Sequence, residues 1–297
     1  MTDPRSAPLP VVAVHGVGCH DPRRTPAEVC AAYSADWARD LAAGLGTDPD
    51  RFDVAMAYYA PHLTRRQAAQ GDDGDDGDDG DDGDDDWQDP LEARLYADWL
   101  AELGAPAAVA QGALTLPLRH TAGWVAEKFS LNGRLTRLFV RVFFREVAAY
   151  LRTPDGPART NAREEVASRI RDHRPTVVVA HSLGTVVTYE ALHAHPELKV
   201  ELLVTLGSPL ALPGAVFERL LPGPLADRGT RPPNVARWVN IADPGDPVAI
   251  PPLLARAFDG IALDLTDTIH SGFGFHYARN YLRCPGVAAT LAPHLGQ

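Results

Sequence analysis

The stretch 177-VVVAHSLGTVV-187 decides the fold. Its Val run predicts a buried strand, and a helix is expected directly afterwards, so the chain must turn sharply at Ser182. Such a turn needs small residues two positions before and after the corner, where Ala180 and Gly184 stand. This is the Gly-x-Ser-x-Gly type of nucleophile elbow, with Ala in place of the first Gly, and it predicts an exposed Ser182 hydroxyl above the carboxyl edge of a sheet. The alternative, a Ser that only caps the helix, does not explain Gly184.

Strands and helices alternate on both sides of this elbow. Thr25, Pro26 and Glu28 form a capping box that starts a helix, and Gly44 is expected to end it. Alternation of this kind predicts an α/β fold with a mostly parallel central sheet and helices on both faces. We expect strands within 8–18, 52–60, 175–182, 200–209, 236–243 and 260–267, and helices near 26–43, 134–152, 157–172, 183–194 and from 275.

The charge of the chain is concentrated in one tract. The formal net charge is -11, but 71-GDDGDDGDDGDDGDDD-86 alone holds 11 of the 39 acidic residues, which leaves the rest balanced against 28 Lys and Arg. No basic patch indicates nucleic acid. We expect 71–86 to be a disordered loop, since it cannot bury apolar surface and its charges repel one another. Its three-residue period matches neither the EF-hand calcium loop nor a β-roll repeat.

The three cysteines and the apolar runs indicate a cytoplasmic protein. Cys19, Cys30 and Cys284 are odd in number and lack metal-site spacing, which predicts reduced thiols rather than disulfides or zinc. The first residues carry no secretory signal pattern, and no apolar run reaches the roughly 18 residues of a membrane span. The 297 residues are expected to form one domain, 1–297.

A Ser nucleophile needs a base and an orienting acid. In a fold built around this type of elbow, they follow the Ser in the order acid, then His. The stretch 239-VNIADPGDPVAIP-251 offers Asp246, with Asp243 as the alternate that would cap the turn. The stretch 269-IHSGFGFHYARNYL-282 offers His276 at the start of a helix, with His270 as the alternate. Position in the chain favours Asp246 and His276.

Backbone N–H groups must hold the oxyanion that forms when a Ser attacks a carbonyl. We expect one from Leu183, directly after the nucleophile, and one from Val17 in the turn 15-HGVG-18. This turn lacks the spacing of a phosphate-binding glycine loop. Strand alternation predicts that His181 points away from the site and has a structural role.

The motifs 12-VAVHGVG-18, 177-VVVAHSLGTVV-187, 243-DPGDPV-248 and 276-HYARNYL-282 occur in this order. With them the chain resembles the α/β-hydrolase superfamily, especially lipase and esterase-like members, over about 10–60 and 157–290. The resemblance implies Ser182 as nucleophile, Asp246 as acid, His276 as base, and Val17 and Leu183 as oxyanion donors. It also implies no metal and no organic cofactor.

The segment 61–156, here called the insertion, matches no pattern in that resemblance. Insertions at this place often form a cap in the family, and Trp99, Trp124 and Trp87 would then contribute an apolar wall. The alternative is that these helices only enlarge the core. Arg137, Arg141 and Arg145 share a face of the helix at 134–152, which is compatible with contact to a membrane surface, although a packed helix with a solvated Arg stripe is the simpler interpretation.

The sequence therefore predicts a serine hydrolase that cleaves a carboxylic ester with an apolar acyl group through an acyl-enzyme on Ser182. Thioester hydrolysis or acyl transfer would use the same residues. A different alternative is a non-catalytic module that holds a protein partner through the insertion. Substrate, acyl length and protein partner are not specified by the sequence.

Overall fold

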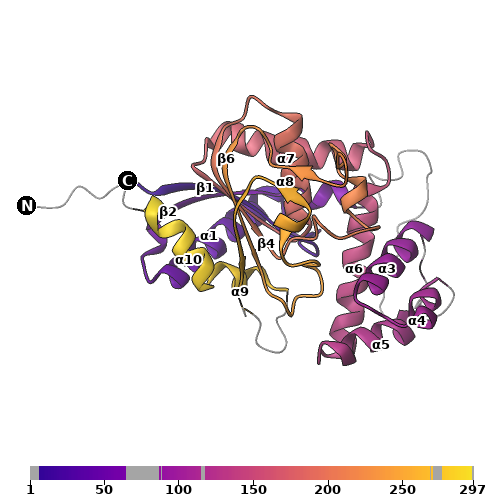
Figure 1. Ribbon diagram of the computed structural model, residues 1–297. Helices are drawn as coiled ribbons and strands as arrows, with labels where there is room; N and C mark the ends of the chain where they lie inside the picture. Colours follow the sequence, from indigo (N-terminus) through magenta and orange to yellow (C-terminus); the bar gives the residue numbers. More distant parts are fainter. Residues whose placement is uncertain are drawn as a thin grey trace, which may run out of the picture.

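Six strands form the central sheet: β1 (Leu9–Val14), β2 (Phe52–Ala57), β3 (Val177–His181), β4 (Val200–Leu206), β6 (Val235–Ala242) and β8 (Ile261–Thr266). Their order is β2-β1-β3-β4-β6-β8, and each neighbouring pair is parallel (Figure 1). The computed structural model describes residues 7–64, 87, 89–114, 118–267, 269 and 276–295. The prediction of an α/β-type fold with a mostly parallel sheet is confirmed.

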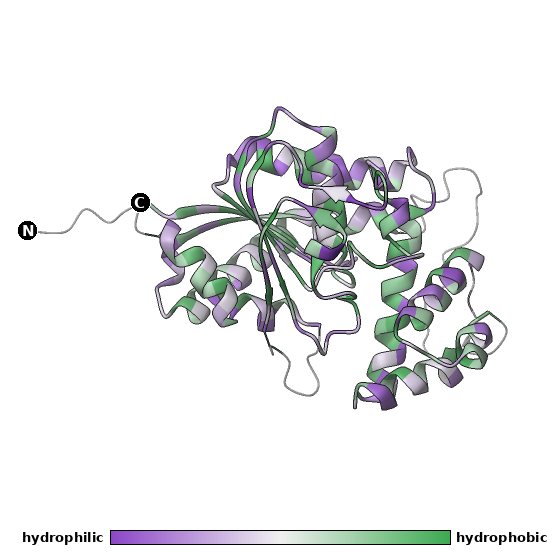
Figure 2. Cartoon of the chain, viewed as in Figure 1, coloured by the Kyte–Doolittle hydropathy of each residue, from purple (hydrophilic) through white to green (hydrophobic). Residues whose placement is uncertain are grey.

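Alternation along β1 shows why the sheet is buried on both faces. Val11 and Ala13 belong to one apolar cluster, whereas Val12 and Val14 belong to the other, and all four are fully buried. A parallel strand covered on both faces has no position for a polar residue, which explains its continuous apolar run. Figure 2 shows the same pattern, with hydrophobic strands in the middle of the molecule.

Helices cover each face of the sheet. One face packs against α1 (Pro26–Leu45), α9 (Ala278–Leu282) and α10 (Pro285–Leu291), and the other against α7 (Pro157–His173) and α8 (Leu183–Ala194). β3 therefore lies in the interior of the sheet with α8 directly after it. The residues at the carboxyl end of β3 are surrounded by protein on every side.

The predicted start of α1 is confirmed and its predicted end is wrong. Thr25 and Glu28 form the capping box, but the helix runs past Gly44 to Leu45 and is capped by Gly46, which adopts the left-handed conformation with φ 64°. A Cβ on Gly44 would lie 2.8 Å from Cα of Arg283. Gly44 thus allows α1 to pack closely on the chain after α9, and this tertiary contact is invisible to a helix-end rule.

The described part of the insertion is helical: α3 (Pro90–Glu102), α4 (Ala107–Gly112), α5 (Leu118–Lys128) and α6 (Gly133–Leu151). Figure 1 shows α3, α4 and α5 gathered against one side of α6. Phe143, Phe144 and Val147 bury one side of α6, while Leu138 is 59% exposed. The predicted loop 71–86 lies outside the described residues.

Short elements escaped the sequence analysis because they have too few residues to show a period. They are β5 (Gly229–Thr230) and β7 (Phe258–Asp259), which pair with each other, and the 3-10 turns η1 (Pro49–Arg51), η2 (Ala60–Leu63), η3 (Phe217–Arg219), η4 (Leu254–Arg256) and η6 (Ala292–His294). Within the described ranges, no helix combines the length and apolar character needed to cross a bilayer.

Candidate functional site

Ser182 stands at the corner between β3 and α8 in a strained backbone conformation. Its φ is 54° and its ψ is -132°, a region that residues with a side chain rarely adopt. Its side chain makes no capping hydrogen bond to α8, so the simple helix-cap alternative is wrong. The predicted exposure is also wrong, because Ser182 is 0% exposed. Among the described residues its Oγ has no hydrogen-bond partner.

Two glycines let neighbouring backbone approach this corner. A Cβ on Gly184 would lie 2.2 Å from the carbonyl oxygen of His15, a distance that no carbon reaches without displacing the backbone. A Cβ on Gly16 would lie 2.8 Å from Cβ of Ser182. The 15–18 turn after β1 therefore lies directly against Ser182, as the elbow pattern predicts.

Of the two candidate acids, Asp246 is the one that meets His276. Nδ1 of His276 lies 2.6 Å from Oδ2 of Asp246, and both side chains are buried. The hydroxyl of Tyr281 donates to the same oxygen at 2.7 Å, and the N–H of Val248 donates to Oδ1 at 2.9 Å. Three hydrogen bonds thus orient the Asp246 carboxylate toward the imidazole.

The alternate acid has another role. The carboxylate of Asp243 accepts the N–H of Gly245 and the N–H of Ile269, each at 2.8 Å, and so ties the turn after β6 to the chain after β8. This agrees with the expectation that Asp243 caps the turn. The alternate base, His270, lies outside the described residues.

The imidazole of His276 packs between two rings. Its centroid lies 4.7 Å from that of His181 and 5.5 Å from that of Phe139, and its Nε2 is buried with no hydrogen-bond partner in the described part of the chain. The expectation that His181 points away from the site is wrong. His181 is the last residue of β3 and alternates onto the same face as Val177 and Val179. The chain after β8 brings His276 and Tyr281 to that face, where both rings pack on His181. Burial, then nearby His276 and His15, hold the pKa of His181 well below its usual range. His181 is therefore neutral at neutral pH.

The two predicted oxyanion donors lie on either side of this corner. Leu183 is the first residue of α8, and the N–H of a first helical residue has no acceptor inside its own helix. Val17 lies in the turn that contacts Ser182. The hydroxyl of Tyr59 donates to the carbonyl oxygen of His15 at 2.9 Å, and burial lowers the pKa of the His15 imidazole to about 4.

The insertion contacts the acid loop through a tryptophan. Nε1 of Trp99 donates to the carbonyl oxygen of Pro247 at 2.7 Å, and Trp99 is 1% exposed, which fits the core interpretation of this residue. Trp87 packs on Tyr96 with ring centroids 5.1 Å apart, and Trp124 is half-buried.

Sequence reasoning missed several residues that touch the site. Tyr281 follows His276 by five residues, yet a lone Tyr in a short helix gives no sign that it will bond an acid. Glu146 of α6 accepts the N–H of Gly18 at 3.0 Å and lies far from every quoted motif. Both contacts are tertiary, and no spacing rule could have found them.

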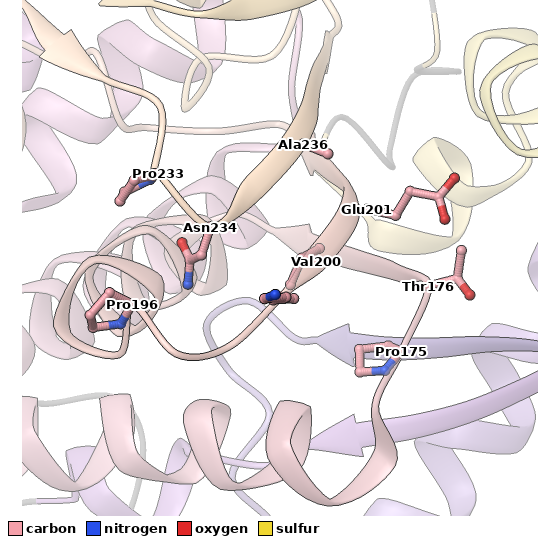
Figure 3. A pocket seen from close by; sticks show the side chains of 9 residues that line it. Pro175, Thr176, Pro196, Val200, Glu201, Pro233, Asn234 and Ala236 are labelled. Carbon is pink, nitrogen blue, oxygen red and sulfur yellow. The ribbon is translucent and has the colours of Figure 1, made fainter.

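A surface pocket lies at the opposite edge of the sheet. It has a volume of about 640 Å³ and is lined by residues before or at the start of β3, β4 and β6, among them Thr176, Val200 and Ala236 (Figure 3). Ligands of open parallel sheets bind at the carboxyl ends of the strands, so this pocket is not the candidate site.

The described residues form no cluster suited to a metal ion, and comparison with known proteins gives no match. Within the described ranges, no group of three or more His, Cys, Asp and Glu side chains is arranged to hold a metal ion. No protein-family model, curated protein or solved structure matches this chain.

Proposed function

We propose that the protein is a serine hydrolase of the α/β-hydrolase type, which cleaves a carboxylic ester through an acyl-enzyme on Ser182. The proposal rests on two observations: the buried Asp246–His276 contact, and a Ser at positive φ at a strand-to-helix corner. Strain of this kind persists only where the surrounding structure imposes it, and it is concentrated at functional sites. The Oγ of Ser182 and the Nε2 of His276 are both buried, and neither has a hydrogen-bond partner among the described residues.

In the first half-reaction, Oγ of Ser182 attacks the acyl carbon, and Nε2 of His276 takes the hydroxyl proton. The Nδ1–H of His276 donates to Asp246, whose carboxylate stabilises the imidazolium that forms. Collapse of the tetrahedral intermediate breaks the ester bond. The alkoxide leaves with the proton from Nε2, and the acyl group remains on Oγ.

In the second half-reaction, water attacks the acyl carbon, and His276 again takes the proton and returns it to Oγ of Ser182. The N–H groups of Val17 and Leu183 donate to the acyl oxygen in both tetrahedral states. Each donor acts from backbone that the neighbouring glycines bring close to Ser182. The products are a carboxylic acid and an alcohol.

The substrate is expected to be a neutral ester with an apolar acyl group. Phe139 packs edge-on against His276, and the partly buried Val17 packs into the main apolar cluster, so the immediate surroundings carry little charge. Because Ser182 is 0% exposed, neighbouring side chains must move before a carbonyl reaches Oγ. The three cysteines are free thiols, which fits a reducing cytoplasm.

Covalent labelling tests the proposal directly. The purified protein is treated with a fluorophosphonate probe, and the modified peptide is identified by mass spectrometry. We expect modification at Ser182 that is lost in Ser182→Ala and retained in Ser168→Ala, a matched variant on the exposed face of α7. A folded protein that is labelled elsewhere, or not at all even after hours, would remove the hydrolase proposal and leave the partner-binding module.

Substitution of the two acids tests their roles. Asp246→Asn is expected to lower kcat on a p-nitrophenyl ester by about 10⁴-fold, because the amide cannot hold the correct His tautomer. Asp243→Asn is expected to cost far less. A larger loss from Asp243→Asn, in a protein with the wild-type thermal midpoint, would reverse the assignment.

A further inference from the structure

The insertion contacts the turn that carries the proposed oxyanion donor. Oε1 of Glu146, on α6, accepts the N–H of Gly18 at 3.0 Å. On the other side of the turn, the hydroxyl of Tyr59 bonds the carbonyl oxygen of His15 at 2.9 Å. Val17 therefore lies between two hydrogen-bonded anchors. Gly18 has a φ of 73°. Because a glycine backbone can adopt many conformations, a hydrogen bond to its N–H is needed to hold it in one of them.

Glu146 is an unusual carboxylate for such a contact. Its Oε2 is buried and, in the part of the chain that the structure describes, has no hydrogen-bond partner. Burial raises the pKa of Glu146 to about 7, against the opposing effects of the Gly18 N–H and of Arg145. Burial, and to a lesser extent the charge of Glu146, raise the pKa of the Cys19 thiol after β1 and of the Tyr59 hydroxyl after β2.

Burying a carboxylate oxygen without a hydrogen-bond partner, as at Oε2 of the half-buried Glu146, destabilises a fold. A neutral residue of similar size at this position would fill the same space without that cost, so stability alone does not explain Glu146. Among the described residues, the one hydrogen bond that the Glu146 carboxylate makes is to the N–H of Gly18, next to Val17. The presence of a carboxylate at position 146 is therefore best explained by the hydrogen bond that it accepts from the 15–18 turn.

We propose that Glu146 is a positioning residue, which fixes the 15–18 turn so that the N–H of Val17 is directed at the acyl oxygen on Ser182. This inference rests on the proposed hydrolase function and goes beyond it, since it gives the insertion a part in the reaction. Glu146 does not touch the substrate. It acts through Gly18, whose N–H is the next donor along the chain after that of Val17.

Steady-state kinetics on p-nitrophenyl butyrate separate positioning from a general structural role. Glu146→Leu removes the acceptor, and we expect kcat to fall about 100-fold, the usual effect of a misplaced or missing oxyanion donor. KM should stay within about 3-fold, because the oxyanion exists only in the transition state. Glu146→Gln keeps an oxygen acceptor and should restore kcat to within about 5-fold of wild type.

The matched control lies on the same insertion. Glu127 is an exposed carboxylate on α5 that, within the described ranges, makes no hydrogen bond to the 15–18 turn. Glu127→Leu and Glu127→Gln should therefore leave both kinetic constants unchanged. Far-ultraviolet circular dichroism and the thermal midpoint establish that each variant folds.

The amide resonance of Gly18 gives a second readout that does not need activity. In the wild-type protein its ¹H shift should move with a midpoint near pH 7, because a carboxylate acceptor makes a stronger hydrogen bond than a protonated one. In Glu146→Gln the movement should disappear while the fold is kept. This measurement decides the contact even where Glu146→Leu fails to fold.

The outcomes separate this inference from the proposed function. A wild-type protein without labelling at Ser182 and without ester hydrolysis would remove the hydrolase proposal itself. If the wild-type protein is active, three results would each contradict the positioning role. They are a folded Glu146→Leu variant whose kcat stays within about 3-fold of wild type, a Glu146→Gln variant whose kcat falls as far as that of Glu146→Leu, and a Gly18 resonance that does not move with pH.

Discussion

Removal of the Ser182 hydroxyl should stabilise the protein while it abolishes the proposed reaction. The Oγ is buried with no hydrogen-bond partner among the described residues, and an unsatisfied buried polar group costs about 1–3 kcal/mol. Ser182→Ala removes this cost and keeps the Cβ. We therefore expect a gain of about 1–3 kcal/mol in the free energy of unfolding.

Ser182→Gly adds a second contribution. A side chain at φ 54° destabilises the native state by about 1–2 kcal/mol, and Gly removes this strain. Gly also makes the unfolded chain more flexible, which lowers the free energy of unfolding by about 0.4–1 kcal/mol. The Gly variant should thus be at least as stable as Ser182→Ala. Urea unfolding followed by Trp fluorescence measures both.

Thr185→Val is the control for these two variants. The hydroxyl of Thr185 is also buried, but it donates to the carbonyl oxygen of Ser182 at 2.7 Å and lies 2.8 Å from Oγ of Ser208. Its removal should destabilise the protein by about 1–3 kcal/mol. The reasoning is refuted if Ser182→Ala is destabilising to a similar degree as Thr185→Val.

Other perturbations test the packing and the buried charges by the same unfolding assay. Gly184→Ala should lower the free energy of unfolding by more than about 3 kcal/mol or prevent folding, since its Cβ would lie 2.2 Å from a backbone oxygen. Gly123→Ala, where a Cβ meets open space, should raise it by up to about 1 kcal/mol. Equal effects of the two substitutions would contradict the close approach at Gly184. Arg159→Met should cost about 3–5 kcal/mol because it leaves the buried Glu190 charged without its cation, with only the Tyr150 hydroxyl and the Leu221 N–H as donors. The double variant with Glu190→Gln should recover much of this stability, and a double variant as unstable as the single one would argue against the ion pair. Between pH 4.5 and about 7 the native state keeps the Glu146 proton, whereas the unfolded state releases it. The free energy of unfolding should therefore fall as pH rises through this window, by at most about 3 kcal/mol. Glu146→Gln should remove that fall, and an unchanged pH slope in this variant would show that Glu146 titrates normally.

Local rules predicted the elements that position the site. β3 and α8 follow from the Val run and from the elbow spacing, because both depend on residues within a few positions of Ser182. The capping box likewise placed the start of α1. The sheet class follows from the alternation of such elements along the chain.

Tertiary contacts explain what the sequence left open. Asp243 and Asp246 both follow β6, and only the position of His276 in space distinguishes them. Gly44 is typical of a helix end in the sequence, but in the structure it allows α1 to pack closely on the backbone at Arg283. The exposure of Ser182 depends on everything packed around it, so a local motif could not give it.

The place of β1 between β2 and β3 has a consequence for synthesis on the ribosome. β1 and β2 precede β3 in the chain and pair with each other in the finished sheet, but the other edge of β1 has no partner until residues 177–181 have been made. At 5–20 residues per second, the intervening stretch takes roughly ten seconds to translate. Throughout that time the chain presents an apolar strand edge that any other strand could join. Newly made chains should therefore depend on chaperones more heavily than the compact product does.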